Sequence, residues 1–216
     1  MSLFSRLAAL LFPPRCIFCR RVTDGEDICP ACRDTLPRCG AVKCRGEFYS
    51  GCCAPLYYRG SVRSALLRYK FRGRTGYARE LGRLVAQCVR EELAGEFDLI
   101  TWAPVSRKRL RERGFDQAKL LAQRTGEALG AEPVETLRKI RETPRNSTIK
   151  GRAERAANVL GVYEAVDPAL VRGRRVLLID DIVTTGATLS ECARTLLMAG
   201  AEDVVCAAAA FAGKNS

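Results

Sequence analysis

The hydrophobic pattern of the chain is clearest around a run of four apolar residues, Val176 to Ile179. A short continuous run of this kind is typical of a strand that is buried on both faces, as in a parallel sheet. Two acidic residues, Asp180 and Asp181, come next, and we expect their side chains to project from an exposed strand end. From Leu189 onward, apolar residues recur at helical spacing. The pattern therefore predicts a strand, a short loop and a helix in that order.

Similar patterns recur elsewhere in the chain. Apolar residues at helical spacing predict helices over residues 77–89, 116–129 and 189–197. Continuous apolar runs predict strands over residues 97–103, 159–163 and 204–211. The run 137–158 carries seven basic and two acidic residues with little periodicity, so we expect a loop that covers a site and ends in a short helix over 153–158. The alternation of strands and helices predicts an α/β fold with a parallel sheet.

Small and polar residues fill the loop that follows the acidic pair. Its backbone N–H groups lie at the start of a helix, where they suit a phosphate group, and they belong to Thr184, Thr185, Gly186, Ala187 and Thr188. Asp180 and Asp181 suit sugar hydroxyls or a divalent cation. Phosphoribosyl pyrophosphate combines a phosphate, vicinal hydroxyls and a metal-binding pyrophosphate, so we predict it as the ligand. A core strand with an exposed acidic end is the alternative, and a Walker phosphate loop is excluded because the Gly-Lys motif is missing.

Cysteines are concentrated near the N-terminus, where eight of the 11 lie between residues 16 and 53. Two CxxC pairs have the spacing of a structural zinc site, and they are Cys16, Cys19, Cys29 and Cys32. Buried free thiols are the alternative. The remaining four are spaced irregularly, and a second zinc site that includes Cys39 and Cys52 is left open. Paired cysteines without a signal peptide indicate a reducing cytoplasm.

The charge balance of the chain is strongly basic, with a formal net charge of +12 at pH 7. This favours polyanionic partners such as phosphorylated substrates or nucleic acid. Residues 59–79 contain seven basic residues and no acid, with aromatic residues between them. Such a segment suits single-stranded DNA, whose bases stack on aromatic rings, although a solvated surface is the alternative. A second basic segment spans residues 107–113.

Other features limit the chemistry and the location of the protein. The sequence has no histidine, so this residue cannot serve as a catalytic base or a metal ligand. No apolar run approaches about 18 residues, so we expect no transmembrane helix. Residues 1–14 are mildly amphipathic. We expect them to dock on the protein's own body, with weak membrane association as the alternative.

Several motifs of the chain occur together in one known family. Besides the cysteine ribbon, they are Tyr69-Lys70-Phe71-Arg72-Gly73, Arg113-Gly114-Phe115-Asp116-Gln117, Arg155 with Asn158, and Asp180-Asp181 with Thr184-Thr185-Gly186. The chain thereby resembles the ComF family, phosphoribosyltransferase-like proteins that help transformable bacteria to import single-stranded DNA. The resemblance implies a type I phosphoribosyltransferase fold, a parallel sheet flanked by helices, over residues 57–216. It also implies a small zinc-ribbon module over residues 1–56.

The resemblance further implies roles for individual residues. Phosphoribosyl pyrophosphate would bind with Mg²⁺, with Asp180 and Asp181 as the catalytic pair. Lys70, Ser106 and Arg107 would contact its pyrophosphate, and Arg155 and Asn158 would belong to a lid. Asp116 stands where family members often carry Asn, and Asn146 is the nearest amide to the Gln of their lid.

The resemblance leaves two functions open. The protein binds the ligand in a role linked to DNA uptake, or it is an active transferase on a nucleobase or amine in nucleotide metabolism or salvage.

Overall fold

The main sheet is built around the apolar run at residues 176–179. The computed structural model describes residues 13–39, 45–144 and 152–212, except for the side chains of residues 152, 153, 155 and 156. Its elements in chain order are α2 (Pro30–Thr35), β1 (Gly51–Cys53), β2 (Leu56–Tyr57), α3 (Gly60–Phe71), α4 (Tyr77–Glu92), β3 (Leu99–Trp102), α5 (Arg107–Arg113), α6 (Gln117–Leu129), β4 (Leu137–Lys139), α7 (Arg152–Val159), β5 (Tyr163–Ala165), the 3-10 helix η2 (Pro168–Leu170), β6 (Arg175–Val183), α8 (Ala187–Met198) and β7 (Asp203–Phe211).

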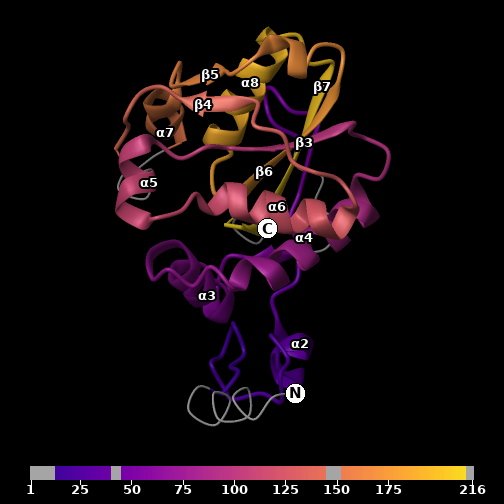
Figure 1. Cartoon of the computed structure of the whole chain (residues 1–216), viewed down its shortest axis with the longest axis vertical. Coiled ribbons are helices and arrows are strands. Elements are labelled where there is room, and N and C mark those ends of the chain that lie inside the picture. The colour runs from indigo at the N-terminus through magenta and orange to yellow at the C-terminus, as the bar shows by residue number, and fades with distance from the viewer. Residues whose placement is uncertain (1–12, 40–44, 145–151, 213–216) are drawn as a thin grey trace.

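The strands of the main sheet follow the order β1-β7-β6-β3, and β2 also pairs with β7. All of these pairs are parallel. Parallel strands require crossover connections, which here place helices over both faces of the sheet (Figure 1). The strands predicted over 97–103 and 204–211 are β3 and β7, so the predicted parallel sheet is confirmed.

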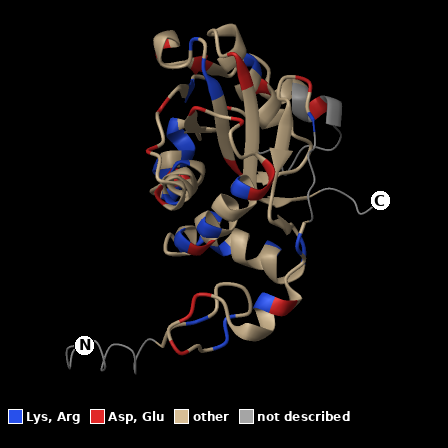
Figure 2. Cartoon of the chain, turned by 90° about the vertical axis from the view of Figure 1, so that its right-hand side faces the viewer, with Lys and Arg blue, Asp and Glu red and all other residues tan. Residues whose placement is uncertain are grey.

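The cysteine-rich N-terminal module lies at one end of the molecule, beyond α3 and α4 as seen from the sheet (Figure 1). Lys, Arg, Asp and Glu occur on both the module and the larger body (Figure 2). Residues 51–57 form β1 and β2 and pair with β7, so the main sheet starts within the segment 1–56 that we assigned to the module.

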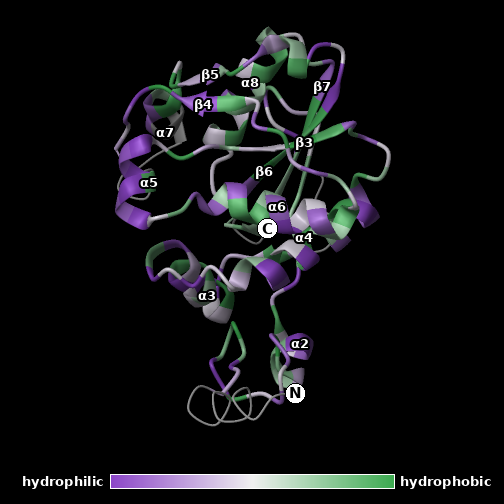
Figure 3. Cartoon of the chain, in the orientation of Figure 1, coloured by the Kyte–Doolittle hydropathy of each residue, from purple (hydrophilic) through white to green (hydrophobic). Residues whose placement is uncertain are grey.

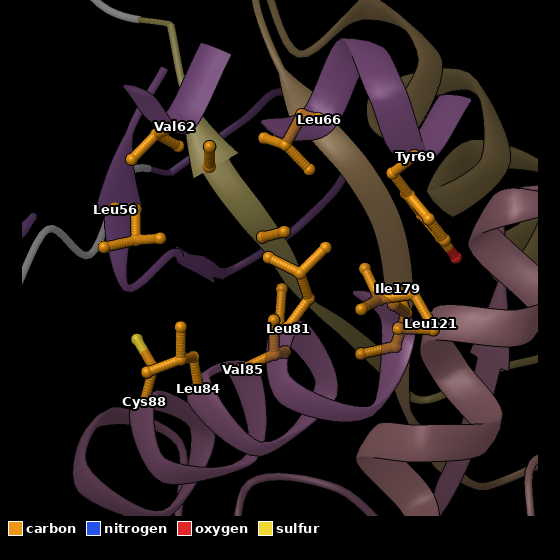
Figure 4. Packing of buried hydrophobic residues seen from close by; sticks show 14 of the residues in the cluster. Leu56, Val62, Leu66, Tyr69, Leu81, Leu84, Val85, Cys88, Leu121 and Ile179 are labelled. Carbon is orange, nitrogen blue, oxygen red and sulfur yellow. The ribbon is translucent and has the colours of Figure 1, made fainter. Parts of the chain in front are cut away.

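The central strand β6 is covered on both faces because its apolar side chains alternate in direction. Leu177 and Ile179 pack into a core formed with α3, α4 and α6. Val176 and Leu178 pack into a second core formed with α8 and the strands β4 and β5. Figure 3 shows the hydrophobic interior of the sheet, and Figure 4 shows the first core, where Ile179 lies near Leu121 of α6.

A two-stranded antiparallel sheet of β4 and β5 replaces part of the loop and the strand that the sequence predicts at 137–163. Both predictions were wrong in detail. The segment Leu137–Lys139 is a strand because Leu137 is buried beside Ala165 of β5. Val159 is buried at the end of helix α7, so the following strand starts only at Tyr163. The short helix predicted over 153–158 corresponds to α7.

None of the helices within the described ranges combines the length and the apolar character that a bilayer crossing requires. Residues 1–12, which contain most of the predicted amphipathic segment, lie outside the described residues.

Candidate functional site

The candidate site arises because β3 and β6 end at different points along the sheet. Pairing of β3 with β6 ends where Trp102 lies opposite Ile179. The β6 strand continues to Val183 along β7. The acidic pair therefore belongs to the strand itself, in a stretch that extends past the end of β3. The sequence did not indicate this longer strand, because two adjacent acids resemble a strand end.

The two carboxylates project toward opposite faces of the sheet. Lys70 Nζ of α3 lies 2.7 Å from Asp181 Oδ2 and donates a hydrogen bond of 3.0 Å to Oδ1. Asp181 is buried, with a relative exposure of 4%, so the expected exposed strand end is wrong for this residue. Asp180 interacts electrostatically with Lys70 as well, and also with Lys139 and Cys192 on the side of β4 and α8. A ligand that meets both carboxylates must therefore straddle the end of the strand.

Asp180 has an unusual affinity for protons. Burial, and then the adjacent charge of Asp181, raises its pKa to about 8, although Lys70 and a backbone hydrogen bond oppose this. That hydrogen bond is donated by the N–H of Asp181 to Asp180 Oδ1 at 2.7 Å. Burial and the charge of Asp181 thus favour the protonated form of the Asp180 carboxyl, and a bound cation would favour release of this proton.

The loop after β6 has the geometry of an anion site. Gly186 is the N-cap of α8, with a φ of 76° in the left-handed region, and its carbonyl accepts a hydrogen bond from Ser190 N at 2.8 Å. Gly186 has no side chain with which to cap the helix, and the Thr185 hydroxyl accepts a hydrogen bond from Ala187 N at 3.4 Å. The N-terminus of α8 favours a bound anion through its helix dipole. Thr184 is exposed, whereas Thr185, Ala187 and Thr188 are partly buried.

Tyr49 lies beside Gly186 of this loop, and the sequence did not indicate this neighbour. A Cβ atom on Gly186 would lie 2.7 Å from the Tyr49 hydroxyl oxygen, so the Tyr49 side chain would have to shift in addition to the strain from φ. This contact could not be predicted from local sequence, because Tyr49 lies 137 positions before Gly186 in an irregular cysteine-rich segment.

The segment expected to meet pyrophosphate follows β3. Ser106 is buried and caps α5, and its hydroxyl donates a hydrogen bond to Glu142 Oε2 at 2.7 Å. Lys108 N donates to Glu142 Oε1 at 3.2 Å. Arg107 is exposed. The carboxylate of Glu142 therefore occupies Ser106, one of the three residues predicted for pyrophosphate, a role that nothing in its basic sequence surroundings indicates.

Asp116 holds the other end of the segment between β3 and α6 in place. Its Oδ1 accepts hydrogen bonds from the N–H groups of Ala118 and Lys119 at the start of α6, both at 3.0 Å. Its Oδ2 accepts from Val105 N at 2.9 Å, which ties the loop after β3 to this helix. An Asn at this position has one acceptor oxygen, so it could not reproduce the whole set of hydrogen bonds. Burial raises the pKa of Asp116.

Lys139 of β4 is another basic residue near the site that the sequence analysis did not select. Burial, followed by the charge of Arg109, lowers its pKa to about 8. Its ammonium lies 5.3 Å from the centre of the Tyr163 ring and donates a hydrogen bond of 2.9 Å to Thr143 Oγ1. The short antiparallel pairing of β4 with β5 brings this lysine toward Asp180.

The lid prediction is only partly covered by the described residues. Asn158 Nδ2 donates a hydrogen bond to the carbonyl of Pro144 at 3.3 Å, so α7 contacts the chain just after β4. The side chain of Arg155 and the whole of Asn146 lie outside the described residues. The lid role of Arg155 and Asn158 therefore stays a prediction.

The two CxxC pairs come together in the N-terminal module. The sulfur atoms of Cys16, Cys19, Cys29 and Cys32 all lie within 4.8 Å of one another, and the Sγ atoms of Cys19 and Cys29 are 3.6 Å apart. Tetrahedral thiolates at about 2.3 Å from a zinc ion would be separated by about 3.8 Å. The donor set therefore fits a metal of this kind. Burial opposes the thiolate of Cys16, but hydrogen bonds from backbone N–H groups bring its pKa down to about 7.

The irregular set of cysteines is only partly covered by the described residues. Cys52 packs in the core on the α8 side of the sheet, and Cys39 donates its backbone N–H to the carbonyl of Pro55. Within the described ranges, metal-ligand geometry unites the four cysteines of the CxxC pairs and does not include Cys39 or Cys52. Cys44 lies outside the described residues, so a second site stays a prediction.

Comparisons with known proteins define the class of this fold. A sequence model of the phosphoribosyl transferase domain matches residues 111–216. This region contains β6, the acidic pair and the loop before α8. With its parallel sheet flanked by helices, the chain has the type I phosphoribosyltransferase fold that the sequence predicted.

Curated relatives narrow the class to one family. The competence protein ComFC of Streptococcus pneumoniae is 30% identical over 184 residues, which cover 83% of this chain and 79% of that protein. The DNA utilization protein YhgH of Salmonella typhimurium is 30% identical over 200 residues, covering 88% and 86%. The chain belongs to the ComF family, and the predicted resemblance is confirmed.

A solved structure gives a more distant comparison. The glutamine phosphoribosylpyrophosphate amidotransferase from B. subtilis is 26% identical over the matched part, with a TM-score of 0.45. The match covers 66% of this chain and 30% of that enzyme.

The contact between Gly186 and Tyr49 predicts an effect on stability. Replacing Gly186 with Ala should lower the free energy of unfolding by about 1–2 kcal/mol from the left-handed φ alone, with a further loss from the crowded hydroxyl. In a Tyr49→Phe background the second loss should disappear, because the hydroxyl is gone. Urea denaturation of the four proteins measures both effects.

Gly76→Ala is the matched control, because Gly76 has a φ of −58° and nothing within 4 Å of the added Cβ. Equal losses from Gly186→Ala in both Tyr49 backgrounds would mean that the hydroxyl does not restrict this position.

Proposed function

We propose that this protein binds phosphoribosyl pyrophosphate together with Mg²⁺ at the open end of β6. One observation carries the proposal: Asp180 and Asp181, on opposite faces of this strand, lie one short loop before the N-terminus of α8, with Lys70 paired to one of them. Carboxylates, an ammonium group and a helix N-terminus are thus combined where ligands bind in open α/β sheets.

Each part of the ligand has a counterpart in this site. The 5′-phosphate would accept hydrogen bonds from the loop Thr184–Thr188, favoured by the helix dipole of α8. The ribose hydroxyls would donate to the carboxylates. The pyrophosphate would compete for Lys70, and it would meet the α5 segment at Ser106 and Arg107 after displacing Glu142. Once Lys70 turns to pyrophosphate, the carboxylate of Asp181 becomes available to the ribose.

Two metals have separate roles in this proposal. Mg²⁺ prefers hard oxygen ligands, so the acidic pair Asp180 and Asp181 would hold it beside the ligand, where it would offset the negative charge of the pyrophosphate. Zinc would occupy the four thiolates of the N-terminal module, where a filled tetrahedral set leaves no position for a substrate. Its role would therefore be structural.

A role in handling imported DNA in the cytoplasm rests on the relatives and on one surface. The names of the relatives refer to competence and to DNA utilization. The two basic segments meet where the guanidinium of Arg113 lies 5.0 Å from the centre of the Phe71 ring. Phe71 is 49% exposed, the exposed Arg72 and Arg74 follow it in the chain, and α5 is mostly hydrophilic (Figure 3). A single strand would find phosphate contacts and an aromatic ring there.

The ligand is tested by calorimetry with phosphoribosyl pyrophosphate in the presence and absence of Mg²⁺. Wild-type protein should bind in a Mg²⁺-dependent manner. Thr185→Val should weaken binding by a charge-assisted hydrogen bond worth about 1.5–3 kcal/mol, which is about 10- to 150-fold.

Thr195→Val is the matched control, in the helix that follows this loop, because its hydroxyl donates to the carbonyl of Glu191, away from the loop. A wild-type protein that shows no binding at millimolar ligand would refute the proposal. Release of pyrophosphate on adding a nucleobase or amine would extend it to catalysis.

The raised pKa of Asp180 predicts how binding responds to pH. The phosphates of the ligand are largely ionised above about pH 7. Affinity for the Mg²⁺ complex should nevertheless continue to rise from pH 7 to 9, as Asp180 loses its proton near pH 8 and its charge becomes available to the cation. Asp180→Asn should bind more weakly and lose this rise. Calorimetry between pH 7 and 9 tests whether affinity rises. Identical pH profiles for wild type and Asp180→Asn would contradict the role of Asp180 in this rise.

The DNA-binding surface predicts a change in salt dependence. Binding of single strands releases counterions, so replacing Arg72 and Arg74 with Ala should reduce the slope of log K against log salt by about 0.7 for each phosphate that is no longer neutralised. Arg172 and Arg174 are equally exposed but precede the opposite end of β6, so their replacement with Ala should leave the slope unchanged. Fluorescence anisotropy with an oligothymidylate measures both, and equal slopes for both variants would reject this surface.

A further inference from the structure

Helix α3 connects the cysteine module to the proposed ligand site through three consecutive side chains, Arg68, Tyr69 and Lys70. Successive residues of an α-helix point about 100° apart, so Arg68 and Lys70 lie on nearly opposite sides of the helix. In Figure 1, α3 lies between the module and the sheet. The last turn of one helix thus contacts both parts of the molecule.

On the module side, Arg68 contacts one of the two CxxC turns. Its Nη2 atom donates hydrogen bonds to the carbonyls of Ile17 at 2.7 Å and Phe18 at 2.9 Å. These are the two residues between Cys16 and Cys19, and both side chains are buried. The guanidinium also lies 5.9 Å from the centre of the Tyr77 ring. A metal that fixes the cysteines would therefore also fix the carbonyls that hold Arg68.

On the side of the sheet, the next two residues complete the connection. Tyr69 is fully buried, and its hydroxyl donates to the carbonyl of Gln117 at 2.7 Å (Figure 4). Lys70 pairs with Asp181 at 2.7 Å. Gly73 follows with a φ of 60°, so the chain turns immediately after the helix. The position of the Lys70 ammonium therefore depends on how firmly this last turn is held.

We propose that Arg68 is a positioning residue for Lys70, and that a filled four-cysteine centre strengthens binding of phosphoribosyl pyrophosphate through it. This inference rests on the proposed function. With the metal in place, the Ile17 and Phe18 carbonyls hold the last turn of α3, and Lys70 is presented to the ligand in one position. Without the metal, the CxxC turn loses its constraint, and Lys70 loses part of its preorganisation for the pyrophosphate.

A second contact between module and body supplies a control. Arg79 of α4 forms a hydrogen-bonded ion pair with Asp27 of the module at 2.7 Å. This pair joins the same two parts through a helix that carries none of the proposed ligand residues. Its loss should therefore loosen the module without moving Lys70.

The experiment is a double-mutant cycle in the full chain, read by calorimetry with phosphoribosyl pyrophosphate and Mg²⁺. Arg68→Ala should weaken binding by about threefold to tenfold, a range typical of coupling between residues that act through a neighbour. The same change in a Lys70→Ala background should have no further effect, because the residue it positions is gone. Arg68→Lys should recover part of the affinity, and Arg79→Ala should bind like the wild type.

The second part of the experiment removes the metal from the four-cysteine centre. Cys19→Ser should lose bound zinc by elemental analysis and weaken ligand binding in the wild-type background but not in the Lys70→Ala background. Circular dichroism reports whether each variant remains folded, and Arg68→Gln replaces Arg68→Ala should the latter unfold.

Three results would overturn the inference: wild-type affinity in folded Arg68→Ala or Arg68→Gln protein, wild-type affinity in folded zinc-free protein, or equal losses with and without Lys70. A wild-type protein that does not bind the ligand would instead refute the proposed function.

Discussion

The ion pair between Lys70 and Asp181 connects the main parts of this structure. It joins α3 to the central strand across 111 positions of sequence, and its carboxylate is almost fully buried. A buried charge pair gains little net stability, because desolvation offsets most of its attraction, but loss of one member leaves the other charge uncompensated. The pair is therefore better understood as a constraint on geometry than as a source of stability. It fixes where the last turn of α3 meets the sheet, and hence how the cysteine module is oriented relative to the strand ends.

The sequence predicted the features that depend on long, regular patterns. The apolar run at 176–179 and the helical period over 77–89 are local signals, and the first half of β6 and most of α4 follow them. The two CxxC pairs were equally informative, because a metal site of this type needs four ligands at short, regular spacing. The glycine at the start of α8 was recognisable for a similar reason: small residues between a strand and a helix are typical of an anion-binding turn.

Features that depend on distant residues were not predictable in this way. Burial of Asp181 requires Lys70 to neutralise it, and no sequence period links the two. Glu142 meets Ser106 only because the pairing of β4 with β5 brings this part of the basic run back over α5. The strand β4 itself is three residues long, too short for a period to show. In each case tertiary contacts decided the outcome.

The opposite orientation of Asp180 and Asp181 has a consequence for how this protein can change during evolution. Side chains alternate along a strand, so insertion or deletion of one residue before the acidic pair would exchange the faces on which the two carboxylates lie. Lys70 would then meet the wrong neighbour, and the apolar residues would exchange cores as well. The central strand can therefore accept substitutions of similar size, but its length is fixed by the chemistry at its end. Variation in length should be confined to the loops outside the sheet, such as the segment between α6 and β4.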